Sequence, residues 1–300
     1  MKNYDVVILG ENIEGITASI YCSRVGLKTL LINLCEPTGD DLSNLKLAHR
    51  LKQQAKDYNV DFLQTSIHFI SPKITPKIVY TEAGPISSKA IILAMGVSAK
   101  KLGIPLESVF HGCGINYHNS CVSSYLKGRT VAIFGNNDSC ADHAITLSAL
   151  VRQVYLIYPN GKIFASPEKI EVIKNAPNIV TLPKTLIYNI TQNNKKLTGI
   201  NIIDKTTGNT GFLDCEIIYV LKGLEPKSKL CSPYILVDKN GFIMTDPSCK
   251  TNLDGIYAVG SIRSPLVDDR SCHYQTYNAN MAATDGAIAA INVIKYIESL

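Results

Sequence analysis

The sequence predicts an α/β protein with two nucleotide-binding-type domains, because one pattern of strand, glycine turn and helix occurs twice. The first copy is the apolar run 4–10, which ends in Gly10 and leads into a helical pattern. The second is the run 131–135, about 125 residues later. A continuous β-branched run that ends in glycine is typical of a strand buried on both faces of a parallel sheet. Another apolar run follows each helix, at 27–34 and 154–158, and completes two βαβ units.

The remaining elements fit the same frame. A helix is expected over 41–57, with Ser43 or Asn44 as its N-cap and apolar residues on one face. Three further strands and a closing helix of small residues are expected, in chain order, at 89–96, 215–221, 254–260 and 281–297.

Composition excludes several classes of protein. The 300 residues suffice for two domains, and 46% hydrophobic against 18% charged residues indicates a folded chain. The net charge of +5 is spread without a run of like charges, which argues against a nucleic-acid surface. No apolar stretch reaches the roughly 18 residues of a membrane span, and the N-terminus enters a strand at once without a leader pattern. Nine cysteines without disulfide-framework spacing favour reduced thiols and a cytoplasmic protein.

Six short motifs occur in the same order as in one known protein family, at 6–15, 90–96, 112–121, 131–144, 223–226 and 255–260. In these motifs the chain resembles the low-molecular-weight thioredoxin reductases, within the pyridine-nucleotide-disulfide oxidoreductases, over nearly its whole length. The resemblance implies two Rossmann-like domains of the FAD/NAD(P)-binding type, with three-layer ββα architecture, the second inserted in the first. It places the FAD-binding-type domain at 1–112 plus 239–300 and the NAD(P)-binding-type domain, which carries the redox motif, at 113–238. It also implies a homodimer.

The first nucleotide turn departs from the pattern that binds a dinucleotide. Gly10 and Gly15 supply the first and third glycines of the turn, but Asn12 stands at the second, where a side chain would crowd a phosphate. Glu11 and Glu14 add two carboxylates near the positive end of the helix dipole that should attract the diphosphate. A sound turn that binds no dinucleotide is the favoured interpretation, and a working flavin site is the alternative.

Several other residues that the resemblance places in contact with the flavin are also replaced in this chain. The glycine-aspartate pair of the family is Gly260-Ser261 here, and the glycines at the start of the last helix are replaced around 281–283. The glutamine of the family is kept as Gln275. FAD is therefore a candidate cofactor whose tight binding these replacements argue against. The candidate flavin site comprises Gly10, Asn12, Gly15, Gly96, Gly260, Ser261 and Gln275.

The second nucleotide turn keeps only Gly135 and Ser139 of the family pattern, so these two are its candidate nucleotide-binding residues. Asp138 is a good N-cap residue that also puts a negative charge beside the phosphate position. Where relatives carry an arginine pair for the 2′-phosphate of NADPH, this chain has Tyr-Pro-Asn-Gly at 158–161. Because no neutral residue replaces a charge-assisted arginine contact, we do not expect NADPH to bind.

The redox motif retains one of its two cysteines. Cys121 aligns with the second cysteine of the family motif, and His118 stands at the first. A nearby imidazolium would lower the thiol pKa and give a reactive monothiol, whereas the alternative is an ordinary buried cysteine left from a dithiol. Cys113 could pair with Cys121 only if the intervening loop allows contact. No metal site is expected, since His and Cys at 111, 113, 272 and 273 lack ligand spacing.

Three functional hypotheses follow. The favoured one is a dimeric pseudoenzyme or binding module that does not reduce a thioredoxin-like substrate with NADPH. The alternative is an FAD-dependent oxidoreductase with a monothiol centre at Cys121 and a different electron donor. In the third, an emptied cleft binds a smaller ligand such as a mononucleotide.

Overall fold

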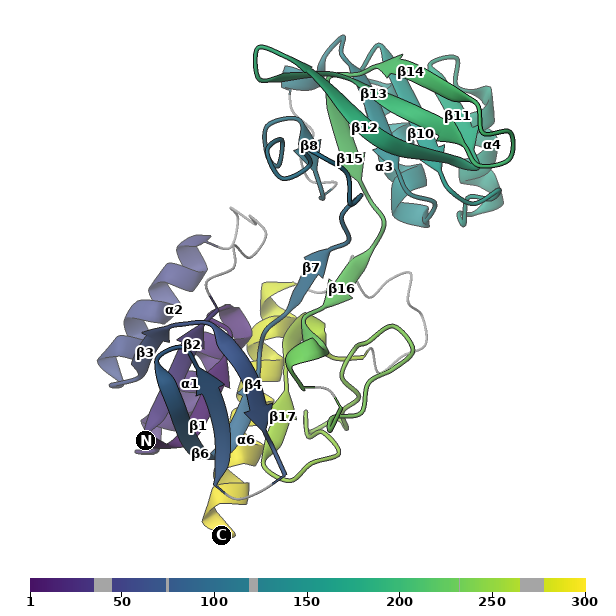
Figure 1. Cartoon of the computed structure of the whole chain (residues 1–300). Coiled ribbons are helices and arrows are strands. Elements are labelled where there is room, and N and C mark those ends of the chain that lie inside the picture. Colours follow the sequence, from purple (N-terminus) through teal and green to yellow (C-terminus); the bar gives the residue numbers. More distant parts are fainter. Residues whose placement is uncertain (35–44, 74–75, 119–123, 232, 265–277) are drawn as a thin grey trace. The chain divides into compact units, whose positions relative to one another are not determined.

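The computed structural model describes residues 1–34, 45–73, 76–118, 124–231, 233–264 and 278–300. The chain forms two units: residues 1–98 with 225–300 make the first, and residues 99–224 make the second (Figure 1). Since both chain ends lie in the first unit, the second is an insertion in it, as expected. Gln275 and Cys121 lie outside the described residues, as do the expected N-caps Ser43 and Asn44.

The first unit is built on a seven-stranded sheet in the order β3-β2-β1-β6-β5-β4, with β17 also paired to β6. Strands β1, β2, β3, β6 and β17 are parallel, whereas β5 pairs antiparallel with β6, and β4 pairs antiparallel with β5 at the edge of the sheet. The strands are β1 (Lys2–Leu9), β2 (Thr29–Asn33), β3 (Asp61–Gln64), β4 (Ile67–Ser71), β5 (Lys77–Thr81), β6 (Gly84–Leu93) and β17 (Ile256–Ala258).

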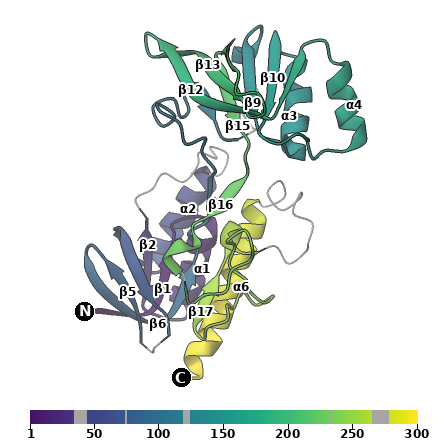
Figure 2. The same ribbon diagram turned by 45° about the vertical axis from the view of Figure 1, so that its right-hand side comes forward.

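Three helices cover one face of this sheet: α1 (Ile13–Arg24), α2 (Leu45–Asp57) and α6 (Ala279–Glu298) (Figure 2). The buried strand β1 shows why its run is apolar throughout. Val6 and Ile8 pack under the helices, while Val7 and Leu9 pack into a second core on the opposite face. The short helices η2 (Ser228–Cys231) and η3 (Gly260–Ile262) contribute to that second core.

The second unit has three layers. Its central five-stranded parallel sheet has the order β11-β10-β9-β15-β8. Helices α3 (Asp138–Ser148) and α4 (Pro167–Asn175) pack with one face, and an antiparallel three-stranded sheet packs with the other. The strands are β8 (Ile115–Asn116), β9 (Thr130–Phe134), β10 (Gln153–Tyr158), β11 (Ile179–Pro183), β12 (Thr185–Asn193), β13 (Lys196–Asp204), β14 (Thr210–Asp214) and β15 (Ile217–Val220), with η1 (Ser124–Leu126) before β9.

The predicted fold class, α/β with two Rossmann-like units of which one is inserted, is confirmed, but both boundaries fall earlier than expected. The chain passes between the units in β7 (Val97–Ala99) and β16 (Leu224–Pro226), which pair with each other. The expected first domain ended at 112 and resumed at 239. Phe110, however, is buried in a core of the second unit, and Ile235 in a core of the first. Hydrophobic packing therefore assigns 99–112 to the second unit and 225–238 to the first.

Candidate functional site

The first nucleotide turn lies at the carboxyl end of β1, and its glycines are required by packing. Gly10 has φ +120°, and a Cβ there would lie 2.0 Å from the carbonyl oxygen of Ala94. A Cβ on Gly15 would lie 2.0 Å from the Gly10 carbonyl oxygen. Both glycines thus allow the helix and the strands to approach each other closely. This packing requires glycine whether or not a dinucleotide is bound.

Asn12 closes this turn with its side chain. It is the N-cap residue of α1, and its Oδ1 accepts a hydrogen bond from the Gly15 N–H at 3.2 Å. Its Nδ2 donates to the carbonyl oxygen of Ala94, at the end of the neighbouring strand, at 2.7 Å. The amide therefore satisfies a helix donor and a strand acceptor at once.

Glu14 is buried in the first turn of α1. A Cβ on Gly260 would lie 2.1 Å from its Oε1, so the carboxyl rests directly against that glycine. The pKa of Glu14 is raised to about 8, mainly by burial and to a smaller extent by the charge of Asp285, against the lowering effect of the residue's own backbone N–H. At neutral pH this carboxyl is mainly protonated, so it fills space instead of supplying the expected charge. Glu11 forms an ion pair with Lys52 of α2.

The structure brings together most of the candidate flavin residues that it describes. A Cβ on Gly96 would lie 3.7 Å from Nδ2 of Asn12 and 3.6 Å from Oγ of Ser261. Gly260 adjoins them through Glu14. The candidate flavin residues that the structure describes therefore lie together at the ends of β1, β6 and β17, while Gln275 lies outside the described residues.

An ion pair that no sequence motif indicates lies beside this cluster. The Asp285 carboxylate accepts from the Gly260 N–H at 3.1 Å and from Arg263 Nη1 at 2.7 Å. Arg263 also donates to Thr245 Oγ1 at 3.0 Å and is 6% exposed. These residues lie far apart in the sequence, and no spacing pattern links them.

FAD, which the resemblance implies, does not fit the first turn as it stands. A bound diphosphate takes the free N–H groups at the start of the helix and needs bare backbone beside them. In this chain the Gly15 N–H is taken by Asn12 Oδ1, the Asn12 side chain stands where the second glycine would leave space, and the Glu14 N–H faces its own carboxyl.

The second nucleotide turn lies at the carboxyl end of β9. Gly135 has φ +151°, and a Cβ there would lie 2.4 Å from the Leu221 carbonyl oxygen. Asn137 is the N-cap residue of α3: its Oδ1 accepts from the Cys140 N–H at 3.0 Å, and its Nδ2 donates to the Leu221 oxygen at 3.2 Å. The thiol of Cys140 donates to the same Oδ1 at 2.9 Å. The candidate residue Ser139 lies in the first turn of α3, partly buried.

NADPH does not fit this turn either. Asp138 and Asp142, in the first turns of α3, share Lys169 of α4 in two ion pairs of 2.7 Å. The carbonyl oxygen of Asn136 accepts from the Phe164 N–H at 2.7 Å, so the segment after β10 is tied to the turn. Two acidic side chains thus flank the helix start, and the 158–161 segment carries no arginine for a 2′-phosphate.

The structure describes the redox region up to His118, an exposed residue. Upstream, the buried carboxylate of Glu107 accepts from the Leu102 and Gly103 N–H groups, at 2.6 and 2.7 Å, and from the Tyr117 hydroxyl at 2.7 Å. Burial and this carboxylate raise the pKa of Tyr117. Cys113 is an exposed free thiol. Cys121 lies outside the described residues. Its action together with His118 and its pairing with Cys113 therefore both stay predictions.

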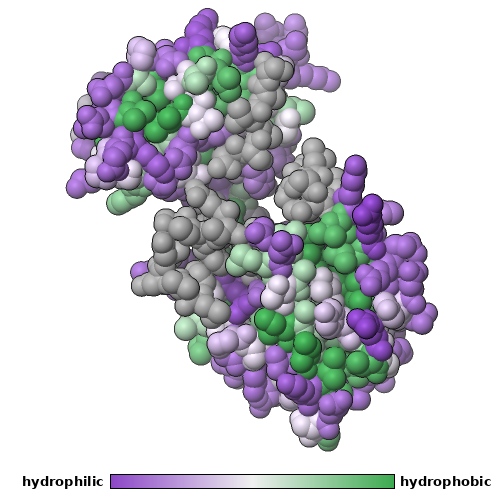
Figure 3. Space-filling model, turned by 180° about the vertical axis from the view of Figure 1, so that it is seen from behind, coloured by the Kyte–Doolittle hydropathy of each residue, from purple (hydrophilic) through white to green (hydrophobic). Residues whose placement is uncertain are grey.

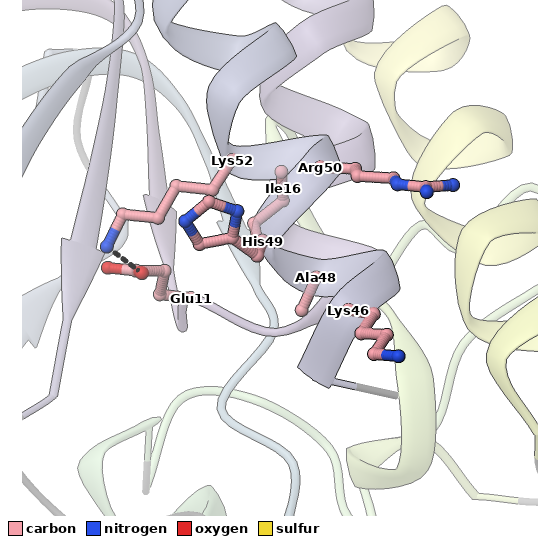
Figure 4. A pocket seen from close by; sticks show the side chains of 7 residues that line it. All are labelled: Glu11, Ile16, Lys46, Ala48, His49, Arg50 and Lys52. Atoms are coloured by element: carbon pink, nitrogen blue, oxygen red, sulfur yellow. Dashed lines mark hydrogen bonds and ion pairs between the residues drawn. The ribbon is translucent and has the colours of Figure 1, made fainter. Parts of the chain in front are cut away.

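An open cavity of about 600 Å³ lies between α1 and α2 and is lined by Glu11, Ile16, Lys46, Ala48, His49, Arg50 and Lys52 (Figure 4). Lys52 reaches Glu11, whereas Arg50 points away from that pair on the other side of α2 (Figure 4). The cationic groups therefore diverge and do not converge on one anion. Within the described ranges, no group of three or more His, Cys, Asp or Glu side chains could hold a metal ion, and no helix is both long and apolar enough to cross a membrane.

Comparison with known proteins identifies the family. Residues 4–286 match the family model of pyridine nucleotide-disulphide oxidoreductases. The chain is 27% identical over 314 residues to a thioredoxin reductase of Treponema pallidum, covering 99% of this chain and 98% of that protein, and 26% identical over 323 residues to that of Bacillus subtilis, covering 100% and 96%.

Solved structures agree in fold. Thioredoxin reductases of Streptococcus pyogenes and Lactococcus lactis superpose with TM-scores of 0.75 and 0.71, at 23% and 24% identity, and each match covers 99% of this chain and 99% and 100% of the other. Members of this family depend on FAD and NADPH. The chain belongs to the pyridine nucleotide-disulphide oxidoreductases and is thioredoxin reductase-like.

Proposed function

We propose that this chain is a thioredoxin reductase-like protein that works without a dinucleotide, as a dimeric binding module, and does not perform NADPH-dependent dithiol reduction. One observation carries the proposal: in each unit an asparagine side chain occupies the nucleotide turn and takes the helix N–H that a diphosphate would use. Because the turns of both units are closed, this observation argues against a change of cofactor at one site alone.

The chemistry of the redox motif supports the same conclusion. Dithiol reduction passes electrons from a nicotinamide through a flavin to a pair of thiols, and all three must be present in one relay. A thiolate at Cys121 could attack a substrate disulfide and form a mixed disulfide. Because His118 replaces the other cysteine of the motif, no second thiol of the motif would then release the substrate.

A second copy of the chain is the proposed partner. Apolar side chains gather on one face of the first unit (Figure 3). The helix layer carries Leu47 of α2 and Met281 and Ile291 of α6, which are 40%, 44% and 43% exposed. Both helices pack against α1, and exposed apolar groups of this size on one helix layer favour a protein interface. The six cysteines that the structure describes are all free, which supports a reducing, cytoplasmic setting.

The direct test is NADPH-driven reduction of a bacterial thioredoxin by the full chain, with FAD supplied in excess. We expect no turnover above that of buffer, and the same result for Cys121→Ser. Turnover that Cys121→Ser abolishes would instead support an FAD-dependent oxidoreductase centred on Cys121. Sedimentation equilibrium tests the dimer separately, with Ile291→Glu and Leu47→Glu expected to shift it towards monomer.

A further inference from the structure

We infer that Asn12 and Asn137 are the residues that exclude dinucleotides from this chain, each acting as a built-in substitute for a diphosphate. The inference rests on the proposed function, because it explains how both turns persist without a cofactor. It assigns the same role to one residue in each unit, although the two units have different sequences around the turn.

The two asparagines match in position and in contacts. Each stands two residues after the glycine that directly follows a strand, β1 or β9, and is the N-cap residue of the next helix. Each Oδ1 accepts the N–H three residues on, that of Gly15 at 3.2 Å or of Cys140 at 3.0 Å.

The hydrogen bonds that the two asparagine Nδ2 groups donate also match. Asn12 Nδ2 donates to the Ala94 carbonyl oxygen at 2.7 Å, and Asn137 Nδ2 donates to the Leu221 carbonyl oxygen at 3.2 Å. In each unit this oxygen is the one closest to a Cβ built on the turn's first glycine, at 2.0 Å for Gly10 and 2.4 Å for Gly135. The amide thus bridges the helix start to the carboxyl end of the adjacent strand in both units.

A bound diphosphate and this amide compete for the same N–H and the same space. A phosphate oxygen is an acceptor for helix N–H groups, as Oδ1 is, but it cannot donate to the strand carbonyl as Nδ2 does. Glycine in place of asparagine frees the N–H and the volume, and it is itself an accepted N-cap residue, so the helix is retained.

Besides the asparagine, acidic side chains lie beside each nucleotide turn, and they differ between the units. In the first turn the Glu14 side chain lies against Gly260, so the opening variant there is the double substitution Asn12→Gly with Glu14→Ala. In the second turn Asp138 and Asp142 are both paired with Lys169, which offsets their charge, so the opening variant there is the single substitution Asn137→Gly. Because the turns lie in different units, each variant tests the inference on its own.

The experiment is titration of the full-length chain with ADP, the diphosphate that FAD and NADPH share, by isothermal calorimetry. Three proteins are compared first: the unmodified chain, the Asn12→Gly/Glu14→Ala variant and the Asn137→Gly variant. We expect both variants to bind ADP at least tenfold more tightly than the unmodified chain. Asn12→Asp keeps the size and the cap acceptor and should show no gain.

Asn278→Gly is the matched control, since Asn278 caps α6 through the Asn280 and Met281 N–H groups but has no place in a nucleotide turn. It should bind no more ADP than the unmodified chain. The inference is overturned for a turn whose opening variant folds, as judged by circular dichroism, and gains no affinity, and it is overturned for both turns if Asn278→Gly gains as much. Tight ADP or FAD binding by the unmodified chain would instead overturn the proposed function.

Discussion

Glu14 is the buried acid of the first unit, and its environment makes stability depend on pH. Its pKa is raised from 4.5 to about 8, first by burial and then by Asp285. At a pH between 4.5 and about 8, the Glu14 carboxyl is protonated in the folded state but has released its proton in the unfolded state. Stability therefore falls as pH rises from about 4.5 to 8, and the loss is complete above the folded pKa.

Glu14→Gln should remove this pH dependence, because glutamine has the same shape and cannot ionise. We expect equal stability at pH 5 and a gain of roughly 2 to 4 kcal/mol at pH 9, since each unit of pKa difference corresponds to about 1.4 kcal/mol. Urea unfolding at the two pH values measures the difference. Parallel curves for the two proteins across this range would show that Glu14 is not buried as an acid.

His143 of α3 gives the opposite dependence in the second unit. It is 3% exposed, its Nε2 has no hydrogen-bond partner, and burial lowers its pKa from 6.5 to about 4. The unfolded state therefore gains a proton first as pH falls, and stability declines below about 6.5.

His143→Phe should keep the edge-to-face contact with Tyr219, whose ring centroid lies 4.3 Å from that of His143. At pH 7.5 we expect stability within about 1 kcal/mol of the unmodified chain, and at pH 5 a gain of about 2 kcal/mol from the removed titration. Guanidinium unfolding at both pH values provides the measurement. No relative gain at pH 5 would contradict the buried neutral imidazole.

At the scale of elements, α1 and α6 offer a matched comparison of two asparagine caps. Asn278→Ala removes only the cap hydrogen bonds of α6 and should cost about 1 kcal/mol. Asn12→Ala also removes the Nδ2 bond to the buried Ala94 carbonyl, and should cost about 1 kcal/mol more. Thermal unfolding of both variants measures the difference. Equal costs would mean that the bond to Ala94 adds nothing.

The βαβ cores were predictable because their strands are buried on both faces. Such strands show a continuous apolar run, and the glycine after each run marks where backbone must approach backbone, as at Gly10 and Gly135. The antiparallel strands β4, β5 and β12–β14 were not assigned from the sequence. Polar residues interrupt each of these strands, on the exposed side in β12 and β13 and on the buried side in β5, where Lys77 and Thr81 lie, so none shows that continuous run.

The site was predictable only in part for a related reason. Asn12 and Ser261 were identified because each breaks a local motif. The contacts that close the turns, from Asn12 to Ala94 and from Asn137 to Leu221, join residues 82 and 84 positions apart. Contacts of this range depend on strand order, which local patterns do not encode.

For the whole molecule, each unit has core clusters of its own on the two faces of its sheet. We therefore expect two calorimetric unfolding transitions. Glu14→Gln should shift only one of them, at alkaline pH, and His143→Phe only the other, at acid pH. A single transition that both variants move would contradict independent units.

The flavin content of the full-length chain tests most directly whether its nucleotide turns are closed. The chain is incubated with excess FAD, passed through a desalting column, and its visible absorption spectrum is recorded. We predict a colourless protein, with far less than one flavin per chain, and a flavin band gained by Asn12→Gly/Glu14→Ala. A stoichiometric flavin band in the unmodified chain would contradict the closure of the first turn by Asn12.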